Sequence, residues 1–395
     1  MRLSISLIIT RVGDRRQIET YLAGLIPFNF PIHESDLADA ITLQAGITQR
    51  KATMRSGKEL LIASNQFARE QRLKSWWHLV STVAIAAALL AVACMKLPLP
   101  VCLISSIVGS LVLVRLFIIY HDYMHGTILA NSRIAGAILR FYGLLVLSPP
   151  HVWKHSHDDH HKHNARNFGR TLGTFPVMST ADYAVSTRWQ RFMYAAMRHP
   201  LTILFGYATI FFWEMSLWAF IANPRKHYDG AMAVVLHIAV AVALSFISWQ
   251  AMILGLVIPM FIITCLGSYL FYAQHNFPGM KRRHGKDWDH VYAALNSSSF
   301  MKMGPFMHWF TGNIGYHHVH HLNARIPFYR LPEAMAGLQE LQSPPVTTLS
   351  PVEIVRCLRL KLWDPAGDRL MTFREASRCR MNGDLHSADS LQPQA

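Results

Sequence analysis

The sequence predicts an all-α integral membrane protein with four transmembrane helices in two hairpins, accompanied by interfacial helices and capped by a cytoplasmic helical domain. Three observations predict this fold. Hydrophobic residues make up 51% of the 395 residues and charged residues only 15%. The apolar residues are concentrated in runs long enough to cross a bilayer. Histidines, 22 in all, gather mainly in clusters outside these runs.

The formal net charge of +15 comes from Lys and Arg placed between and after the apolar runs, as in Arg50-Lys51. Cations in such loops are typical of segments that face an anionic cytoplasmic leaflet. A nucleic-acid-binding protein would instead need a basic face on a soluble domain. We therefore expect these basic residues to face a membrane and expect no nucleic acid as a partner.

Residues 1–75 are mixed and polar, and we expect them to form a cytoplasmic N-terminal segment. Arg11 and the acidic and basic residues at 14–16 interrupt the first apolar stretch, so no cleaved signal peptide is predicted. The five cysteines are scattered and never form a CxxC pair. We expect them to be reduced and inert.

The first predicted hairpin has spans at about residues 79–95 and 101–120, joined by a short connection that contains Pro98 and Pro100. Arg115 is the only charged residue inside these two runs. Because it lies close to the end of its span, we expect its side chain to reach the cytoplasmic interface.

The second predicted hairpin has spans at about residues 231–249 and 251–272. Two further apolar segments are weaker candidates, because 134–147 is short and contains Arg140, and 201–222 contains Glu214. An even number of crossings must separate histidine clusters that meet on one side of the membrane. Four spans satisfy this condition, so both weaker segments are predicted to be interfacial or re-entrant helices. Both termini are then cytoplasmic, which agrees with the positive-inside rule.

Histidines occur in three clusters whose spacing is helical. The first cluster has two histidines at i and i+4, and the second and third each have three at i, i+3 and i+4. On a helix these positions share one face. The eight residues are His121, His125, His157, His160, His161, His317, His320 and His321.

Neutral imidazole is a ligand that suits Fe(II), and eight imidazoles from three segments could hold two irons with a position left for dioxygen. A single pair could be a feature of the interface, and a single HxxHH could be a zinc or nickel loop. Three clusters on one side of the membrane favour a common metal site. The cap of the spans is thus predicted to be a helical di-iron domain.

Other polar residues near the clusters are expected to support the ligands or to face solvent. Asp122, Asp158 and Asp159 could orient imidazole N–H groups, or could simply be solvated. For His151, His155, His163 and His318, which do not fit the spacing, a supporting or solvent-exposed role is predicted.

The clusters, written HDYMHG, SHDDHH and HHVHH, resemble the three histidine boxes of the membrane fatty acid desaturases. The resemblance continues in the neighbouring segments and spans about residues 75–370, so that a desaturase domain is expected over 76–375, with a disordered tail at 376–395. It is strongest to the bacterial and cyanobacterial acyl-lipid branch, which includes omega-6-like enzymes. The segments that carry it are 115–120, 312–316, 322–327 and 358–364.

The resemblance also implies a ninth ligand, because the family uses a further histidine just after the last span. His275 stands at that place in the segment 272–276. It could alternatively be a polar residue that ends an interfacial helix. The first box departs from the family pattern, since Tyr123 and Met124 replace Cys and Gly. This change puts the shape of the substrate channel in doubt, and the stretch 164–174 also lacks a close match.

By resemblance, the expected activity is O2-dependent insertion of a mid-chain cis double bond into a long-chain fatty acyl group of a membrane lipid. The chain has no HPGG haem-anchoring motif and no Gly-rich dinucleotide motif. A separate ferredoxin or cytochrome-type protein is therefore expected to supply the electrons. It would dock on Lys281, Arg282 and Arg283, on the cytoplasmic side of a bacterial inner membrane.

Two other functions remain open from the sequence. A hydroxylase, acetylenase or carotenoid ketolase would use the same ligands and differ only in its product. A histidine-rich metal transporter or sensor would place ionisable ligands inside its spans, where this sequence has only His237.

Overall fold

The computed structural model describes residues 55, 57–165, 175–283 and 285–381. By its internal contacts the chain divides into two units, residues 1–56 and 57–395, and the second unit contains the described helices and strands. The predicted N-terminal segment as far as residue 54, the stretch 166–174 and the tail from residue 382 lie outside the described residues.

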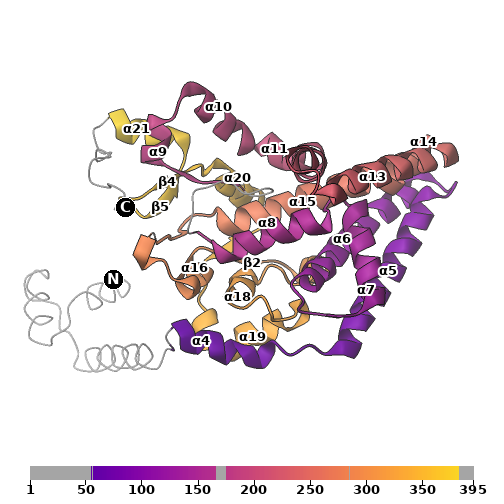
Figure 1. Cartoon of the computed structure of the whole chain (residues 1–395), viewed down its shortest axis with the longest axis horizontal. Coiled ribbons are helices and arrows are strands. Elements are labelled where there is room, and N and C mark those ends of the chain that lie inside the picture. The colour runs from indigo at the N-terminus through magenta and orange to yellow at the C-terminus, as the bar shows by residue number, and fades with distance from the viewer. Residues whose placement is uncertain (1–54, 56, 166–174, 284, 382–395) are drawn as a thin grey trace, which may run out of the picture. The chain divides into compact units, whose positions relative to one another are not determined.

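Four helical stretches of the described chain are long and apolar enough to cross a membrane, which confirms the predicted spans (Figure 1). They are α5 (Arg72–Cys94), α6 (Leu99–Met124), α13 (Tyr228–Ile247) and a composite of α14 (Trp249–Met252), the π-helix η3 (Ile253–Val257) and α15 (Ile258–His275). The second and fourth extend past their predicted ends at residues 120 and 272. The first box and His275 therefore stand on the span helices themselves.

Small residues hold the spans together, as expected where lipid replaces water and close backbone approach replaces the hydrophobic effect. Gly109 of α6 lies so close to α5 that a Cβ there would be 3.3 Å from Leu89. Ser106 of α6 donates a hydrogen bond of 2.7 Å to the carbonyl of Leu254 in η3. The first contact packs the two helices of the first hairpin together, and the second joins this hairpin to the other one.

Arg115 differs from its prediction, because its side chain turns into the protein instead of reaching the interface. It is 4% exposed. It donates to the carbonyl of Trp309 at 2.6 Å and bonds to Nδ1 of His78 at 3.1 Å. Trp309 belongs to α17 (Pro305–Phe310), a helix far away in sequence. A carbonyl and a ring nitrogen thus pair with the two terminal nitrogens of the guanidinium inside the fold, whereas its Nε atom has no hydrogen-bond partner among the described residues.

The segment 134–147 forms α7 (Arg133–Leu145), whose first turn is capped by the side chain of Ser132. Its 13 residues span about 20 Å at 1.5 Å per residue, which is too short to cross the apolar core. The segment 201–222 is divided into α11 (Pro200–Leu204), the π-helix η2 (Tyr207–Trp218) and α12 (Ala219–Ala222). Tyr207 bonds to His237 of α13, and Ser216 donates to the carbonyl of Phe211 at 2.9 Å.

The elements outside the spans are short helices and a few short strands. The helices are α4 (Gly57–Ser64), η1 (Asn65–Phe67), α8 (Pro150–Lys162), α9 (Thr180–Val185), α10 (Arg188–Met197), η4 (Gly285–Asp287), α16 (His290–Asn296), α17, α18 (His317–Leu322), η5 (Phe328–Arg330), α19 (Leu331–Gly337), η6 (Gln339–Leu341), α20 (Pro351–Arg359) and α21 (Phe373–Met381). The last of these crosses the predicted boundary at residue 375, so folded structure continues into the segment predicted to be a disordered tail.

The strands form two small sheets that were not predicted. They are β1 (Met178–Ser179), β2 (Phe300–Lys302), β3 (Val346–Thr348), β4 (Leu362–Asp364) and β5 (Arg369–Met371). In the first sheet β4 is central, parallel to β1 and antiparallel to β5, and in the second β2 and β3 are parallel. Strands of two or three residues are too short to show a two-residue period in the sequence.

Candidate metal centre

The predicted ligands come together from the ends of two span helices and from two short helices outside the spans. His121 lies in the last turn of α6, His125 is the C-cap residue of that helix, and His275 ends α15. The second box lies in α8, and the third fills α18. Pro149 and Pro150 open α8, where a missing N–H costs nothing. The histidine boxes that were predicted to be helical therefore lie on helices or at helix ends in the structure.

Nine histidines form two groups whose ring nitrogens face inward. In each group the potential ligand atoms all lie within 4.8 Å of one another. The first group is His121, His125, His157, His161 and His320, and the second is His160, His275, His317 and His321. These are the eight box histidines and the additional His275, with no other described residue among them.

Within each group Nε2 atoms face Nε2 atoms at short distances. In the first group, Nε2 of His121 lies 3.0 Å from that of His157. In the second, Nε2 of His275 lies 2.8 Å from that of His317 and 3.0 Å from that of His160. A neutral imidazole offers one donor and one acceptor, so a ring of converging Nε2 atoms cannot be satisfied by protons alone.

This arrangement fits transition-metal ions. The Nε2 atom of His125 is buried and has no hydrogen-bond partner among the described residues. Burial is the main cause that lowers the pKa of the six grouped histidines of α8 and α18 well below 6.5, and neighbouring imidazoles lower that pKa further. Neutral imidazole is the form that binds a metal. Five and four such donors are a set suited to iron, copper, nickel or zinc.

The rear nitrogens of two ligands are held by groups of the chain. Nδ1 of His121 lies 2.9 Å from Asp122, whose other oxygen accepts a 2.7 Å hydrogen bond from the backbone N–H of Phe328. Nδ1 of His275 lies 3.1 Å from the carbonyl of Ser297. Such partners fix the tautomer and the ring orientation of a metal ligand.

The other two acids predicted to orient imidazoles pair with groups outside the cluster. Asp158 forms an ion pair with Lys154 at 2.9 Å. Asp159 contacts Nδ1 of His163 at 2.9 Å, and His163 belongs to neither group. Of the three acids, only Asp122 touches a predicted ligand in the described contacts.

The remaining histidines that did not fit the spacing lie outside both groups. His151 is exposed and pairs with Asp229 at 3.4 Å, and His155 is exposed. His318 is fully buried, but its Nε2 atom bonds to the carbonyl of Leu341 at 3.1 Å. Burial lowers the pKa of His318 to about 4. It therefore supports α18 from behind.

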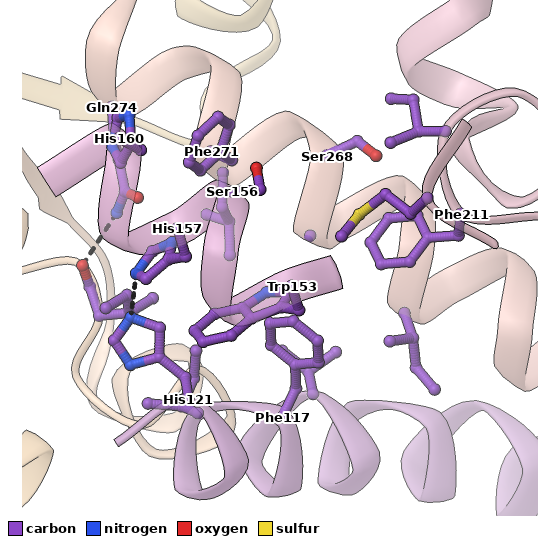
Figure 2. A pocket seen from close by; sticks show the side chains of 18 of the residues that line it. Phe117, His121, Trp153, Ser156, His157, His160, Phe211, Ser268, Phe271 and Gln274 are labelled. Atoms are coloured by element: carbon purple, nitrogen blue, oxygen red, sulfur yellow. Dashed lines mark hydrogen bonds between the residues drawn. The ribbon is translucent and has the colours of Figure 1, made fainter. Parts of the chain in front are cut away.

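A cavity lies against the metal centre, and Figure 2 shows it from close by. His121, His157 and His160 lie at one end in this view, and Phe211 lies at the opposite end. The walls are mainly apolar: Val114, Phe117, Ile118, Trp153, Ile210, Phe211, Met215, Ile263, Leu270 and Phe271. Mainly apolar walls with a few polar groups are typical of pockets that bind a small organic ligand.

Sequence reasoning missed the aromatic residues that pack on the ligands. Trp153 stacks on His157, with ring centroids 4.3 Å apart and planes inclined by 20°. Phe271 contacts His160 at a centroid distance of 4.8 Å. The sequence contained a signal for both aromatic residues. Trp153 precedes His157 by one helical turn, and Phe271 precedes His275 by one turn.

The three cations predicted to dock an electron donor have different surroundings. Arg282 is 7% exposed and lines a second cavity, which also touches His160 and His275. Arg283 is exposed, and its guanidinium lies 3.7 Å from the ring centroid of Tyr292. Lys281 is half-exposed and pairs with Asp368 at 3.4 Å. Two of the three cations are thus accessible.

Comparison with known proteins agrees with this geometry. A family model described as fatty acid desaturase matches residues 96–349, which include α6, α13, α15 and all nine histidines. A fatty acid desaturase of Bacillus subtilis is 30% identical over 283 residues, which cover 68% of this chain and 76% of that protein.

Two cyanobacterial relatives are more distant. The sn-1 oleoyl-lipid 12-desaturase of Synechocystis sp. is 25% identical over 237 residues, covering 58% of this chain and 65% of that protein. The sn-1 acyl-lipid omega-3 desaturase (ferredoxin) of Nostoc sp. is 23% identical over 235 residues, covering 57% and 63%.

Proposed function

The chain belongs to the fatty acid desaturase family, and from this premise we propose that it inserts a mid-chain cis double bond into a long-chain acyl group of a membrane lipid. The observation that carries the proposal is the apolar cavity that ends at two groups of converging imidazoles. A cavity of this kind fits an alkyl chain. The imidazoles lie where that chain would pass the metal centre.

We propose that the two groups hold one iron each. His121, His125, His157, His161 and His320 would bind the first, and His160, His275, His317 and His321 the second. Two bound irons would supply the electrons that splitting dioxygen requires. In the overall reaction, two hydrogens leave adjacent methylenes, and O2 with two electrons and two protons becomes two waters.

The side chains of the cavity position the chain and exclude water. Trp153 and Phe271 pack on ligand imidazoles and also line the cavity, so an acyl methylene against these rings lies beside the metal centre. A dry apolar wall keeps water away from the reacting carbons. Asp122 holds the ring of His121 in one tautomer.

We propose that the electrons come from a separate donor of the ferredoxin or cytochrome type. The name of the Nostoc relative includes ferredoxin, which supports the first alternative. We propose that the accessible cations Lys281 and Arg283 attract the acidic surface of such a donor. Arg282 is buried, so it would attract the donor only through the positive electrostatic field of its guanidinium.

The protein is an integral membrane protein by its four spans and its family. We place the metal centre and both termini on the cytoplasmic side of a bacterial inner membrane. The support is the position of Lys and Arg, which lie mostly in the long segments between and after the spans.

The test compares the variants His321→Ala and His155→Ala in a host whose lipids lack the product. His321 belongs to the second group. His155 lies in the second box segment, beside predicted ligands, but its side chain is exposed. We expect His321→Ala to abolish the new double bond with membrane insertion intact, and His155→Ala to keep it. Mass spectrometry of the host lipids gives both the product and the bond position.

Two results would contradict the proposal. Retained product in His321→Ala would contradict the site assignment. A hydroxy or keto lipid with unchanged unsaturation would instead identify a hydroxylase or ketolase that uses the same ligands.

A further inference from the structure

The helix α10 has two apolar faces, although a helix at the surface of a soluble domain normally has one. Its inner face carries Tyr194, which is 2% exposed and packs in a small core with Leu362 and Met371. Its outer face carries Trp189, 67% exposed, and Phe192, 60% exposed. The outer face therefore holds large apolar side chains that no described residue covers.

The exposed side chains form one stripe. Trp189, Phe192 and Met193 are at i, i+3 and i+4, so they share one side of the helix. The rings of Trp189 and Phe192 stack, with centroids 5.5 Å apart. Arg188 and Arg191 are the charged residues of the helix, which contains no acid. An apolar stripe on a basic helix is typical of helices that lie in a membrane surface.

The depth of α10 relative to the spans points the same way. Arg198, at the C-terminal cap of α10, donates to the hydroxyl of Tyr272 at 3.1 Å. Tyr272 lies in the last turn of α15, where the fourth span ends. The C-terminal end of α10 therefore lies beside the last turn of the fourth span helix.

The exposed apolar surface also continues along the chain. Leu201 and Phe205, just after α10, are 55% and 49% exposed, and Trp213 of η2 is 51% exposed. The helix η2 is joined to the span α13 through the Tyr207–His237 hydrogen bond. Exposed apolar side chains thus follow the chain from the stripe to a helix that contacts a membrane span.

We propose that α10 lies along the membrane surface, with Trp189, Phe192 and Met193 in the boundary between lipid headgroups and acyl chains. Lipid is the occupant of the stripe, and Arg188 at its edge faces anionic headgroups. Through Tyr194, α10 then attaches the sheet β1-β4-β5 to the bilayer. This inference requires insertion of the chain in a membrane and does not depend on catalysis.

The experiment measures the depth of nitroxide labels on the full-length protein in nanodiscs of phosphatidylcholine and phosphatidylglycerol in equal amounts. The labels are placed by Trp189→Cys and Phe192→Cys, in a background where Cys94, Cys265 and Cys379 are serine. The control is Ser377→Cys on α21, because Ser377 is exposed and its neighbour Ala376 belongs to the same small core as Tyr194.

We expect labels at 189 and 192 to collide more with oxygen, which concentrates in lipid, than with a nickel complex, which stays in water. The label at 377 shows the reverse order. Labels at 189 and 192 that behave like the label at 377 would overturn the proposal. So would a short distance between labels on two copies, which would identify a second chain as the occupant. Unchanged thermal midpoints show that each variant is folded.

Discussion

Three acidic residues beside the histidine boxes look alike in the sequence but have different neighbours. Asp122 is 1% exposed and joins His121 to the backbone of Phe328. Asp158 and Asp159 remain within their own helix and bond to residues four positions away. The difference depends on η5, which a sequence pattern does not bring next to α6.

Replacing Asp122 by Asn is expected to weaken iron binding or activity by about 10–100-fold, the usual effect of losing a carboxylate behind a metal-bound imidazole. The amide is neutral and polarises the ring of His121 less. Bound iron per protein, measured by plasma mass spectrometry, and product yield report the effect. Asp158→Asn is the matched control, because Asp158 pairs only with Lys154 in the described contacts. Equal losses in the two variants would contradict this role of Asp122.

At the scale of elements, the π-helix η2 sets the end of the cavity opposite the histidines. Phe211 and Met215 line the cavity, and Figure 2 places Phe211 far from His157. Ser216 bonds to the carbonyl of Phe211, five residues earlier, which fixes the wide turn of this helix. π-helical turns are frequent at functional sites. Neither the width of the helix nor its contact with the cavity could be read from an apolar run.

The variant Phe211→Ala is expected to extend the cavity away from the metal centre. Such a truncation of a buried Phe costs about 3–5 kcal/mol when the space stays empty, so a longer acyl chain that fills it should bind relatively better. In the metal-free protein, the preferred fatty acid is the one that gives the largest thermal shift. We expect this preferred fatty acid to have a longer chain for Phe211→Ala than for the unchanged protein. Trp213→Ala, on the exposed side of η2, is the control. The same preferred chain length in both variants would show that Phe211 does not form the end wall.

For the molecule as a whole, the sequence was sufficient for the spans and for the meeting of the histidines at a common place. Long apolar runs have few other solutions, and histidines at helical spacing must share a face. The sequence was insufficient where contacts between segments far apart in the chain determine the local structure. Arg115 was predicted to face the interface and is buried because Trp309 offers a carbonyl. The short strands and the folded residues beyond 375 also depend on pairing and packing between segments that are far apart in the sequence.

Removal of iron is expected to lower the thermal midpoint of the whole protein. A ligand that binds only the folded state stabilises it by about 2.7 kcal/mol at one hundred times its dissociation constant, and these ligands come from four separate helices. Calorimetry of iron-loaded and chelator-treated protein in detergent measures the difference. An unchanged midpoint after complete iron removal would mean that the metal centre does not contribute to folding stability.

The two groups of imidazoles do not correspond to separate boxes. The helix α8 gives His157 and His161 to the first group and His160 to the second, whereas α18 gives His320 to the first and His317 and His321 to the second. Occupation of either group fixes the backbone that carries donors for the other. The entropy of ordering α8 and α18 is then lost only once. The second ion should bind more tightly than the first, so partly loaded enzyme is expected to be scarce.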